Sequence, residues 1–161
     1  MRSDKIVLAV MSVLLLSVAA HAAEKANCTI KVPTREEIVA TDRMTTLMAE
    51  YGPVSIMLKN QIEIVEDSKE LYAEKNVSDD DCVKMVQASN NAVEVLLKRA
   101  EKVRNEYLRS KLIERMKFIV QGNNAYIKYY KGSMPNRVEA EKFWQQADTC
   151  EKDIQHYIRG E

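Results

Sequence analysis

Residues 79–107, DDDCVKMVQASNNAVEVLLKRAEKVRNEY, decide the fold class, because apolar and small residues recur in them at intervals of three and four. The recurring positions are Cys82, Val86, Ser89, Val93, Leu96, Ala100, Val103 and Tyr107. This spacing lines one face of an α-helix and resembles a coiled-coil seam over nearly four heptads. We therefore expect a long amphipathic helix that buries one face.

Beyond Tyr107 the apolar stripe shifts to a new set of positions, which are Leu108, Leu112, Met116, Ile119 and Ile127. Residues 79–131 are therefore either two helices with a turn near Arg104–Lys111 or one helix with a rotated face. The clearest loop is Gly132–Asn136, where Asn136 with Glu139 can cap a last helix that ends at Arg159-Gly160.

Upstream of residue 79, capping signals predict where further helices begin. Thr34 and Glu37 have the spacing of a capping box, which predicts a first helix from Arg35 to Tyr51. Gly52-Pro53 then favours a stop followed by a second helix to about Lys75, and a kink in one longer helix is the alternative. Ser78 is expected to cap the next helix, with Asp79–Asp81 in its first turn.

No stretch shows the period-two alternation of a half-buried strand, and no repeat of 20–50 residues is visible. The sequence thus predicts an all-α fold, an up-and-down antiparallel bundle of four or five helices in residues 35–161. An extended tail over residues 23–34 is expected to precede the bundle domain.

Residues 1–22 have the pattern of a secretory signal peptide. Arg2 and Lys5 precede an uncharged run over residues 6–20, and Ala20-His21-Ala22 gives the small-x-small spacing that a signal peptidase accepts. The run is shorter than the roughly 20 residues that span a bilayer. We therefore expect cleavage before Ala23 and a secreted or periplasmic protein.

Export places all three cysteines, Cys28, Cys82 and Cys150, in a compartment where thiols tend to oxidise. The number predicts one disulfide and one leftover thiol, which is either buried or links two chains into a dimer. The reach of the N-terminal tail makes Cys28 with Cys150 feasible, and Cys82 is the competing partner.

Several function classes are disfavoured by composition. With 24 basic and 24 acidic residues the net charge is zero, which argues against nucleic acid as a partner. Loss of His21 with the signal peptide leaves His156 as the single histidine, so a multi-histidine metal site cannot form within one chain. No glycine-rich phosphate loop or nucleophile motif occurs. We therefore expect a non-enzyme without a cofactor or metal.

Clustered aromatic residues are the best candidates for a contact surface. They are Tyr126, Tyr129, Tyr130, Phe143 and Trp144, on either side of the predicted loop at Gly132. Tyrosine and tryptophan gather at interfaces because a flat apolar body and a polar tip both find partners there, although the same residues can simply close the end of a bundle. The sequence predicts binding of a protein or a small ligand.

Two alternatives remain open at the sequence level. The layout is similar to that of exported four-helix haem proteins. This similarity implies an electron-transfer bundle with Met44, Met48 and His156 as candidate ligands. The two methionines also fall on the core stripe of the first helix, where methionine usually fills gaps. Alternatively, the basic stretch Lys98–Lys117 could bind an anionic membrane surface, since Lys98, Lys102 and Arg109 would share one helix face. Acidic residues of neighbouring helices could also balance this stretch.

Overall fold

The computed structural model describes residues 33–161. The chain divides into two units, Met1–Ile38 and Val39–Glu161, and the second unit contains nearly all of the described helices. The predicted signal peptide, most of the predicted tail and Cys28 lie outside the described residues.

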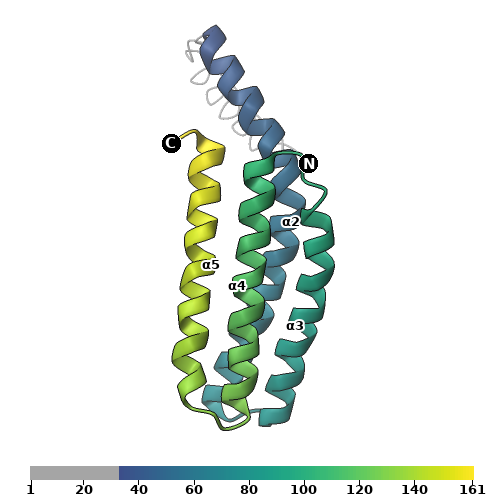
Figure 1. The fold of residues 1–161 in the computed structure, drawn as a ribbon, viewed down its shortest axis with the longest axis vertical. Helices are drawn as coiled ribbons and strands as arrows, with labels where there is room; N and C mark the ends of the chain where they lie inside the picture. The colour runs from purple at the N-terminus through teal and green to yellow at the C-terminus, as the bar shows by residue number, and fades with distance from the viewer. Residues whose placement is uncertain (1–32) are drawn as a thin grey trace, which may run out of the picture. The chain divides into compact units, whose positions relative to one another are not determined.

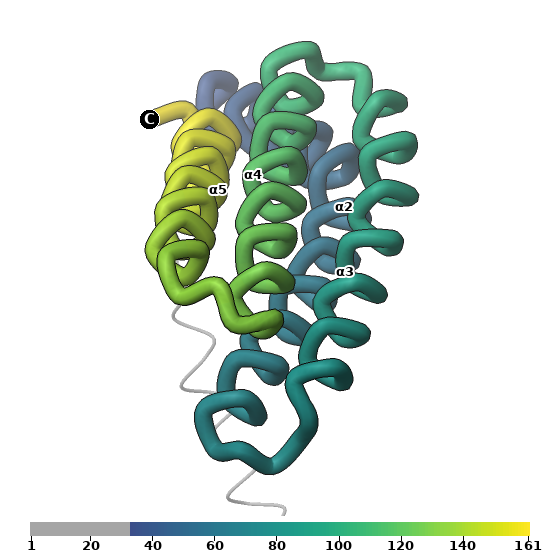
Figure 2. The backbone as a smooth tube through the Cα atoms, turned by 60° about the horizontal axis from the view of Figure 1, so that its bottom comes forward, coloured from purple at the N-terminus to yellow at the C-terminus, as the bar shows by residue number. Residues whose placement is uncertain are grey.

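The described part of the chain forms four helices and no strand. They are α2 (Arg35–Glu74), α3 (Asp79–Ala100), α4 (Glu106–Tyr130) and α5 (Pro135–Arg159). Within the second unit the helices run alternately up and down, and α4 packs against both α3 and α5 (Figure 1). Figure 2 shows the same arrangement from another side, with α2 beside α3. The predicted all-α, antiparallel bundle is confirmed.

The first predicted break is wrong, because α2 continues through Gly52-Pro53 as one helix of 40 residues. A proline within a helix removes one backbone hydrogen bond, and its ring clashes with the Cβ of the preceding residue. Gly52 has no Cβ, which relieves that clash. Tyr51 and Val54 are both buried on either side of the pair. Their burial holds the two halves of α2 against the core. Of the two predictions, one longer helix is therefore correct, and the kink in it stays a prediction.

The chain turns between α3 and α4 at residues 101–105, slightly earlier than expected. Asn105 caps α4 by accepting a hydrogen bond from the N–H of Leu108 at 3.0 Å. The carboxylate of Glu50, on α2, accepts the N–H groups of Arg104 and Asn105 at 3.0 Å each. Residues 79–131 are therefore two helices, and Tyr107 lies 38% exposed instead of continuing the buried stripe.

Two of the three predicted caps are confirmed. Thr34 and Glu37 exchange backbone-to-side-chain hydrogen bonds of 2.7 and 3.2 Å, and the Ser78 hydroxyl accepts the N–H of Asp81. The prediction for Asn136 is wrong, because its side chain donates to Ser133. Pro135 has a fixed φ that suits a first helical position, so α5 begins before Asn136.

The core contains the predicted stripes. Residues of those stripes that are buried include Cys82, Val86, Ser89, Val93, Leu96, Ala100, Leu108, Leu112, Met116 and Ile119, and the same core includes Leu58 and Val65 of α2. Met44 and Met48, by contrast, are 43% and 44% exposed, so their predicted place on the core stripe is wrong. Leu47 and Tyr51 are the buried positions of that part of α2. Among the described helices, none is both long enough and apolar enough to cross a membrane.

Candidate functional site

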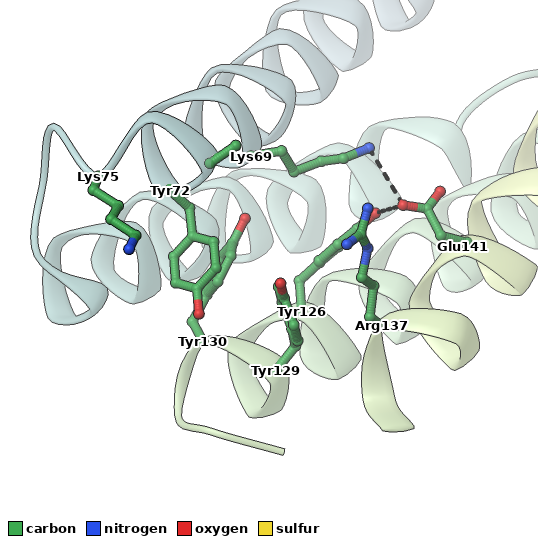
Figure 3. Close-up of a pocket in the computed structure, with 9 residues that line it drawn as sticks. Lys69, Tyr72, Lys75, Tyr126, Tyr129, Tyr130, Arg137 and Glu141 are labelled. Atoms are coloured by element: carbon green, nitrogen blue, oxygen red, sulfur yellow. Dashed lines mark hydrogen bonds and ion pairs between the residues drawn. The ribbon is translucent and has the colours of Figure 1, made fainter. Parts of the chain in front are cut away.

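A cavity of about 270 Å³ lies between α2, α4 and α5. We call it the tyrosine pocket, because four tyrosines line it (Figure 3). Its lining residues are Lys69, Tyr72, Ala73, Lys75, Tyr126, Tyr129, Tyr130, Arg137 and Glu141. The last turns of α2 and α4 and the first turns of α5 meet here because the bundle alternates in direction.

The tyrosine rings are brought together by helical spacing on α4 and by one residue of α2. Tyr126, Tyr129 and Tyr130 stand three and four residues apart, so their side chains share one face of α4. Tyr72 contacts this face, with ring centroids 5.3 Å from Tyr129 and 4.7 Å from Tyr130. Tilted aromatic pairs at these separations are favourable. The result is a wall of four adjoining rings.

The buried base of the wall is fixed by hydroxyl contacts. The Tyr130 hydroxyl lies 3.1 Å from Oγ of Ser68, which donates to the carbonyl of Val65 at 2.7 Å. Burial raises the pKa of Tyr130 to about 12, so its hydroxyl stays protonated at neutral pH. Tyr130 therefore supports the pocket as a rigid, neutral side chain.

Part of the pocket's charge is neutralised internally. Lys69 pairs with Glu66 at 3.1 Å and with Glu141 at 3.8 Å, and its ammonium lies 5.1 Å from the centroid of the Tyr126 ring. The Tyr126 hydroxyl donates to Glu141. Burial, and then this bond to Glu141, raises the pKa of Tyr126. The Glu141 carboxylate is thus already occupied by Lys69 and Tyr126.

Two other cations line the pocket without such a partner. Within residues 33–161, no carboxylate forms an ion pair with Lys75 or with Arg137. The guanidinium of Arg137 lies 6.0 Å from the centroid of the Tyr129 ring. Figure 3 shows the two cations at opposite ends of the row of tyrosines. The pocket therefore combines an aromatic wall with uncompensated positive charge.

The sequence prediction located part of this site. Tyr126, Tyr129 and Tyr130 all line the pocket, whereas Phe143 and Trp144 do not. Trp144 is 7% exposed and packs behind the pocket, where Gly122 leaves room for its indole ring. The sequence did not predict the other lining residues, among them Tyr72 on α2, Lys75 just after α2 and Arg137 on α5. Only the bundle brings these distant segments together.

A second polar cluster, which we call the Glu151 cluster, contains similar residue types but is closed. The Tyr51 hydroxyl lies 2.6 Å from the Glu151 carboxylate, which also accepts a hydrogen bond from Gln155 at 2.8 Å. Arg115, which is only 8% exposed, pairs with the same carboxylate. Burial, followed by the bond to Glu151, raises the pKa of Tyr51 to about 12. The charges of Arg115 and Glu151 thus compensate each other, although Nε of Arg115 is buried without a hydrogen-bond partner, and these side chains line neither the tyrosine pocket nor the open cavity at His156.

The basic stretch does not form the continuous face expected for membrane binding. The turn at residues 101–105 contains Lys102 and separates Lys98, on α3, from Arg109, on α4. Lys111 pairs with Asp153 at 2.9 Å and with Glu114 at 3.3 Å, and both bonds raise its pKa. The acidic residues of α5 thus balance part of this stretch.

The three candidate haem ligands are not gathered in one cavity. His156 is exposed and lies 3.2 Å from the Glu161 carboxylate. The open cavity of about 450 Å³ that His156 lines includes neither Met44 nor Met48. Within residues 33–161, no group of three or more His, Cys, Asp or Glu side chains could hold a metal ion.

Cys82 and Cys150 are both buried and carry free thiols. Burial is the first cause that raises the pKa of each thiol, and buried cysteines are generally less reactive than exposed ones. Cys82 donates to the carbonyl of Ser68 at 3.6 Å. Because Cys28 lies outside the described residues, its pairing with Cys150 stays a prediction.

Comparisons with models of protein families, with characterised proteins and with solved structures return no match for this chain.

Proposed function

We propose that this chain is an exported, non-enzymatic bundle protein that binds a small ligand, or a single side chain of a partner protein, in the tyrosine pocket. The carrying observation is the cavity of about 270 Å³ with four tyrosines in its wall. Ligand pockets generally combine an apolar or aromatic wall with a few polar groups, in volumes of roughly 300–1,000 Å³. The tyrosine pocket has this character, close to the lower size limit.

The chemistry of the lining supports binding over catalysis. Tyr126 and Tyr130 have raised pKa values and remain neutral at neutral pH, so neither supplies a ready base or nucleophile. The Glu141 carboxylate is engaged by Tyr126 and Lys69. Tyrosine is well suited to a contact surface, since it offers a large, rigid area with only two side-chain torsions to fix.

The test is native mass spectrometry of the protein produced from its full reading frame and purified without denaturation from its own host. We expect a bound small molecule or partner, whose occupancy falls at least fivefold in Tyr129→Ala. Tyr129 is half-buried and lies at the surface of the wall, so its removal spares the buried tyrosines.

Tyr107→Ala is the matched control, because Tyr107 is an exposed tyrosine at the opposite end of α4. Its occupancy should equal that of the wild type. Equal occupancy in Tyr129→Ala and wild type, with both proteins folded, would contradict the proposal. The same spectra measure the mature N-terminus, and export predicts that it is Ala23.

A further inference from the structure

We infer that the ligand of the tyrosine pocket is a flat aromatic anion, such as an aromatic carboxylate, with its ring against the tyrosine wall and its acid group at the Lys75 end of that wall, while Arg137 at the other end adds to the positive potential of the pocket. This inference rests on the proposed function. Three independent features of the pocket carry it: the shape of the wall, the balance of charge and the backbone of Lys75.

The wall favours a flat, apolar body. Four tyrosine rings adjoin one another, with neighbouring centroids 4.7–6.0 Å apart. Tyr72 and Tyr129 are only half-buried, so their rings present surface to the cavity. Aromatic ligands gain from offset or edge-to-face contact with such rings beyond the area that they bury.

The charge of the lining favours an anion. Three cations and one carboxylate line the pocket, and that carboxylate, Glu141, is held by Lys69 and Tyr126. Lys75 and Arg137 have no ion-pair partner among the described residues. Asp79 is near enough to contribute to the raised pKa of Tyr72, but it forms no ion pair with Lys75. A cationic ligand would find no free carboxylate in the lining.

The backbone conformation of Lys75 also supports a functional role for this residue. Lys75 follows the last residue of α2 with φ of 55°, a left-handed conformation that glycine usually provides at the end of a helix. Its N–H bonds to the carbonyl of Tyr72 at 3.3 Å, and the N–H of Asn76 bonds to Leu71 at 3.2 Å. A non-glycine residue here is strained, and strained residues cluster at functional sites. Among the described residues Lys75 is the one non-glycine with positive φ, and its side chain lines the pocket.

An isosteric series of three probes separates shape from charge. 2-Naphthoate, 2-naphthamide and 2-naphthamidinium share the same naphthalene ring system. The first carries a negative charge, the second is neutral and the third carries a positive charge. We expect isothermal titration calorimetry on the full protein to show tightest binding of 2-naphthoate, at least threefold weaker binding of the amide and no measurable binding of the amidinium.

Substitutions at the two cations test the assignment. Lys75→Gln should weaken 2-naphthoate binding about two- to fivefold, the range for an exposed ion pair, and Arg137→Gln should weaken it by a smaller factor, while 2-naphthamide binds as before. Lys75→Gly should weaken 2-naphthoate binding as much as Lys75→Gln does and should also raise the melting temperature. A raised melting temperature would show that the loss of binding is not caused by unfolding. Lys128→Gln removes an exposed α4 lysine outside the lining and should leave binding unchanged.

The outcomes are distinct. If 2-naphthamide binds as tightly as 2-naphthoate, and Tyr129→Ala weakens both, the pocket binds a ligand but the inference of an anion is overturned. If none of the probes binds and no co-purified ligand depends on Tyr129, the proposed function fails with it. Preference for the amidinium would reverse the assigned charge. Loss of the 2-naphthoate preference in the Lys75→Gln/Arg137→Gln double variant supports the inference.

Discussion

The tyrosine pocket and the Glu151 cluster are built from the same residue types, tyrosine, a basic residue and glutamate, and they differ in what is left over. In the Glu151 cluster, one carboxylate binds Tyr51, Arg115 and Gln155, and every charge has a partner. In the tyrosine pocket, a cavity of about 270 Å³ remains, and Lys75 and Arg137 have no ion-pair partner within residues 33–161. Residue type alone therefore does not separate a closed cluster from an open pocket. Unfilled volume, and charge left without a partner among the described residues, separate the two.

The largest effect is expected in the Glu151 cluster. Glu151→Ala leaves Arg115, which is 8% exposed, without its carboxylate. Removing one partner of a buried ion pair is strongly destabilising, so we expect a loss of about 3 kcal/mol in the free energy of unfolding. Urea denaturation measures it. The double variant Arg115→Met/Glu151→Met should recover most of the loss, and a change below about 1 kcal/mol in Glu151→Ala would show that this cluster is not structural.

The next largest effect is expected at Gly122, where α4 and α5 approach each other behind the tyrosine pocket. A Cβ added at Gly122 would lie 2.6 Å from Cδ1 of Trp144 and 3.3 Å from the carbonyl oxygen of Ala140. Alanine favours a helix over glycine by roughly 1 kcal/mol, but overpacking costs about 1–3 kcal/mol. Because the contact includes the indole ring and the α5 backbone, we expect Gly122→Ala to lose about 2 kcal/mol of stability in thermal or urea unfolding.

A second change tests that explanation. Gly122→Ala combined with Trp144→Leu removes the indole ring from the position of the new Cβ, so the penalty of the alanine should be smaller in the Trp144→Leu background. A stabilising effect of Gly122→Ala in the wild-type background would contradict the close approach of α4 and α5 at this point.

Alkaline pH should weaken both regions by the same mechanism. Tyr51 and Tyr130 have pKa values of about 12 in the fold against the usual 10.0, so the folded chain holds their protons more tightly than the unfolded chain. Their contribution to stability is complete below about pH 10 and is lost as the pH rises from about 10 to about 12. Each tyrosine adds at most about 1.4 kcal/mol per pH unit to this decline.

Urea midpoints at pH 9, 10 and 11 measure the decline. Tyr51→Phe should make it shallower, because the Glu151 cluster then no longer contains an ionisable hydroxyl. Tyr107→Phe is the control, since Tyr107 lies exposed outside both regions. An identical slope for Tyr51→Phe and wild type would refute the raised pKa of Tyr51.

The smallest expected effect is a gain in the free energy of unfolding. Lys75→Gly relieves the left-handed backbone at φ of 55° and should raise the free energy of unfolding by about 0.5–1 kcal/mol. Lys131→Gly is the matched control, because Lys131 also follows a helix, α4, but has φ of −82°. That control should lose stability by a similar amount. Thermal unfolding of the two variants side by side decides the point, and a loss in Lys75→Gly would remove the argument from strain.

Much of the fold could be predicted because the signals are local. The stripe from Cys82 to Ala100, the Thr34–Glu37 capping box and the Ser78 cap are visible within a few turns of one helix, and the structure contains each of them. The errors arose where tertiary packing overrides a local signal. Gly52-Pro53 reads as a stop, yet burial of Tyr51 and Val54 on either side keeps α2 continuous.

The site was only partly predictable for the same reason. Tyr126, Tyr129 and Tyr130 form a local pattern on α4, so the sequence could group them, and they line the pocket together. Nothing in the sequence brings Tyr72, Lys75 or Arg137 to the same cavity. Phe143 and Trp144 were placed with the tyrosines by proximity in sequence, but the helical rotation of α5 turns them away from the lining.

The most direct test is ¹³C NMR of the full protein with labelled tyrosine rings, titrated with 2-naphthoate. The chain has seven tyrosines, distributed over the pocket, the Glu151 cluster and the far end of the bundle. We predict large, saturating shifts for Tyr72, Tyr129 and Tyr130, and none for Tyr51, Tyr107 or Tyr157. Shifts centred on Tyr107 and Tyr157, or no shift at any tyrosine, would contradict the assignment of the tyrosine pocket as the binding site.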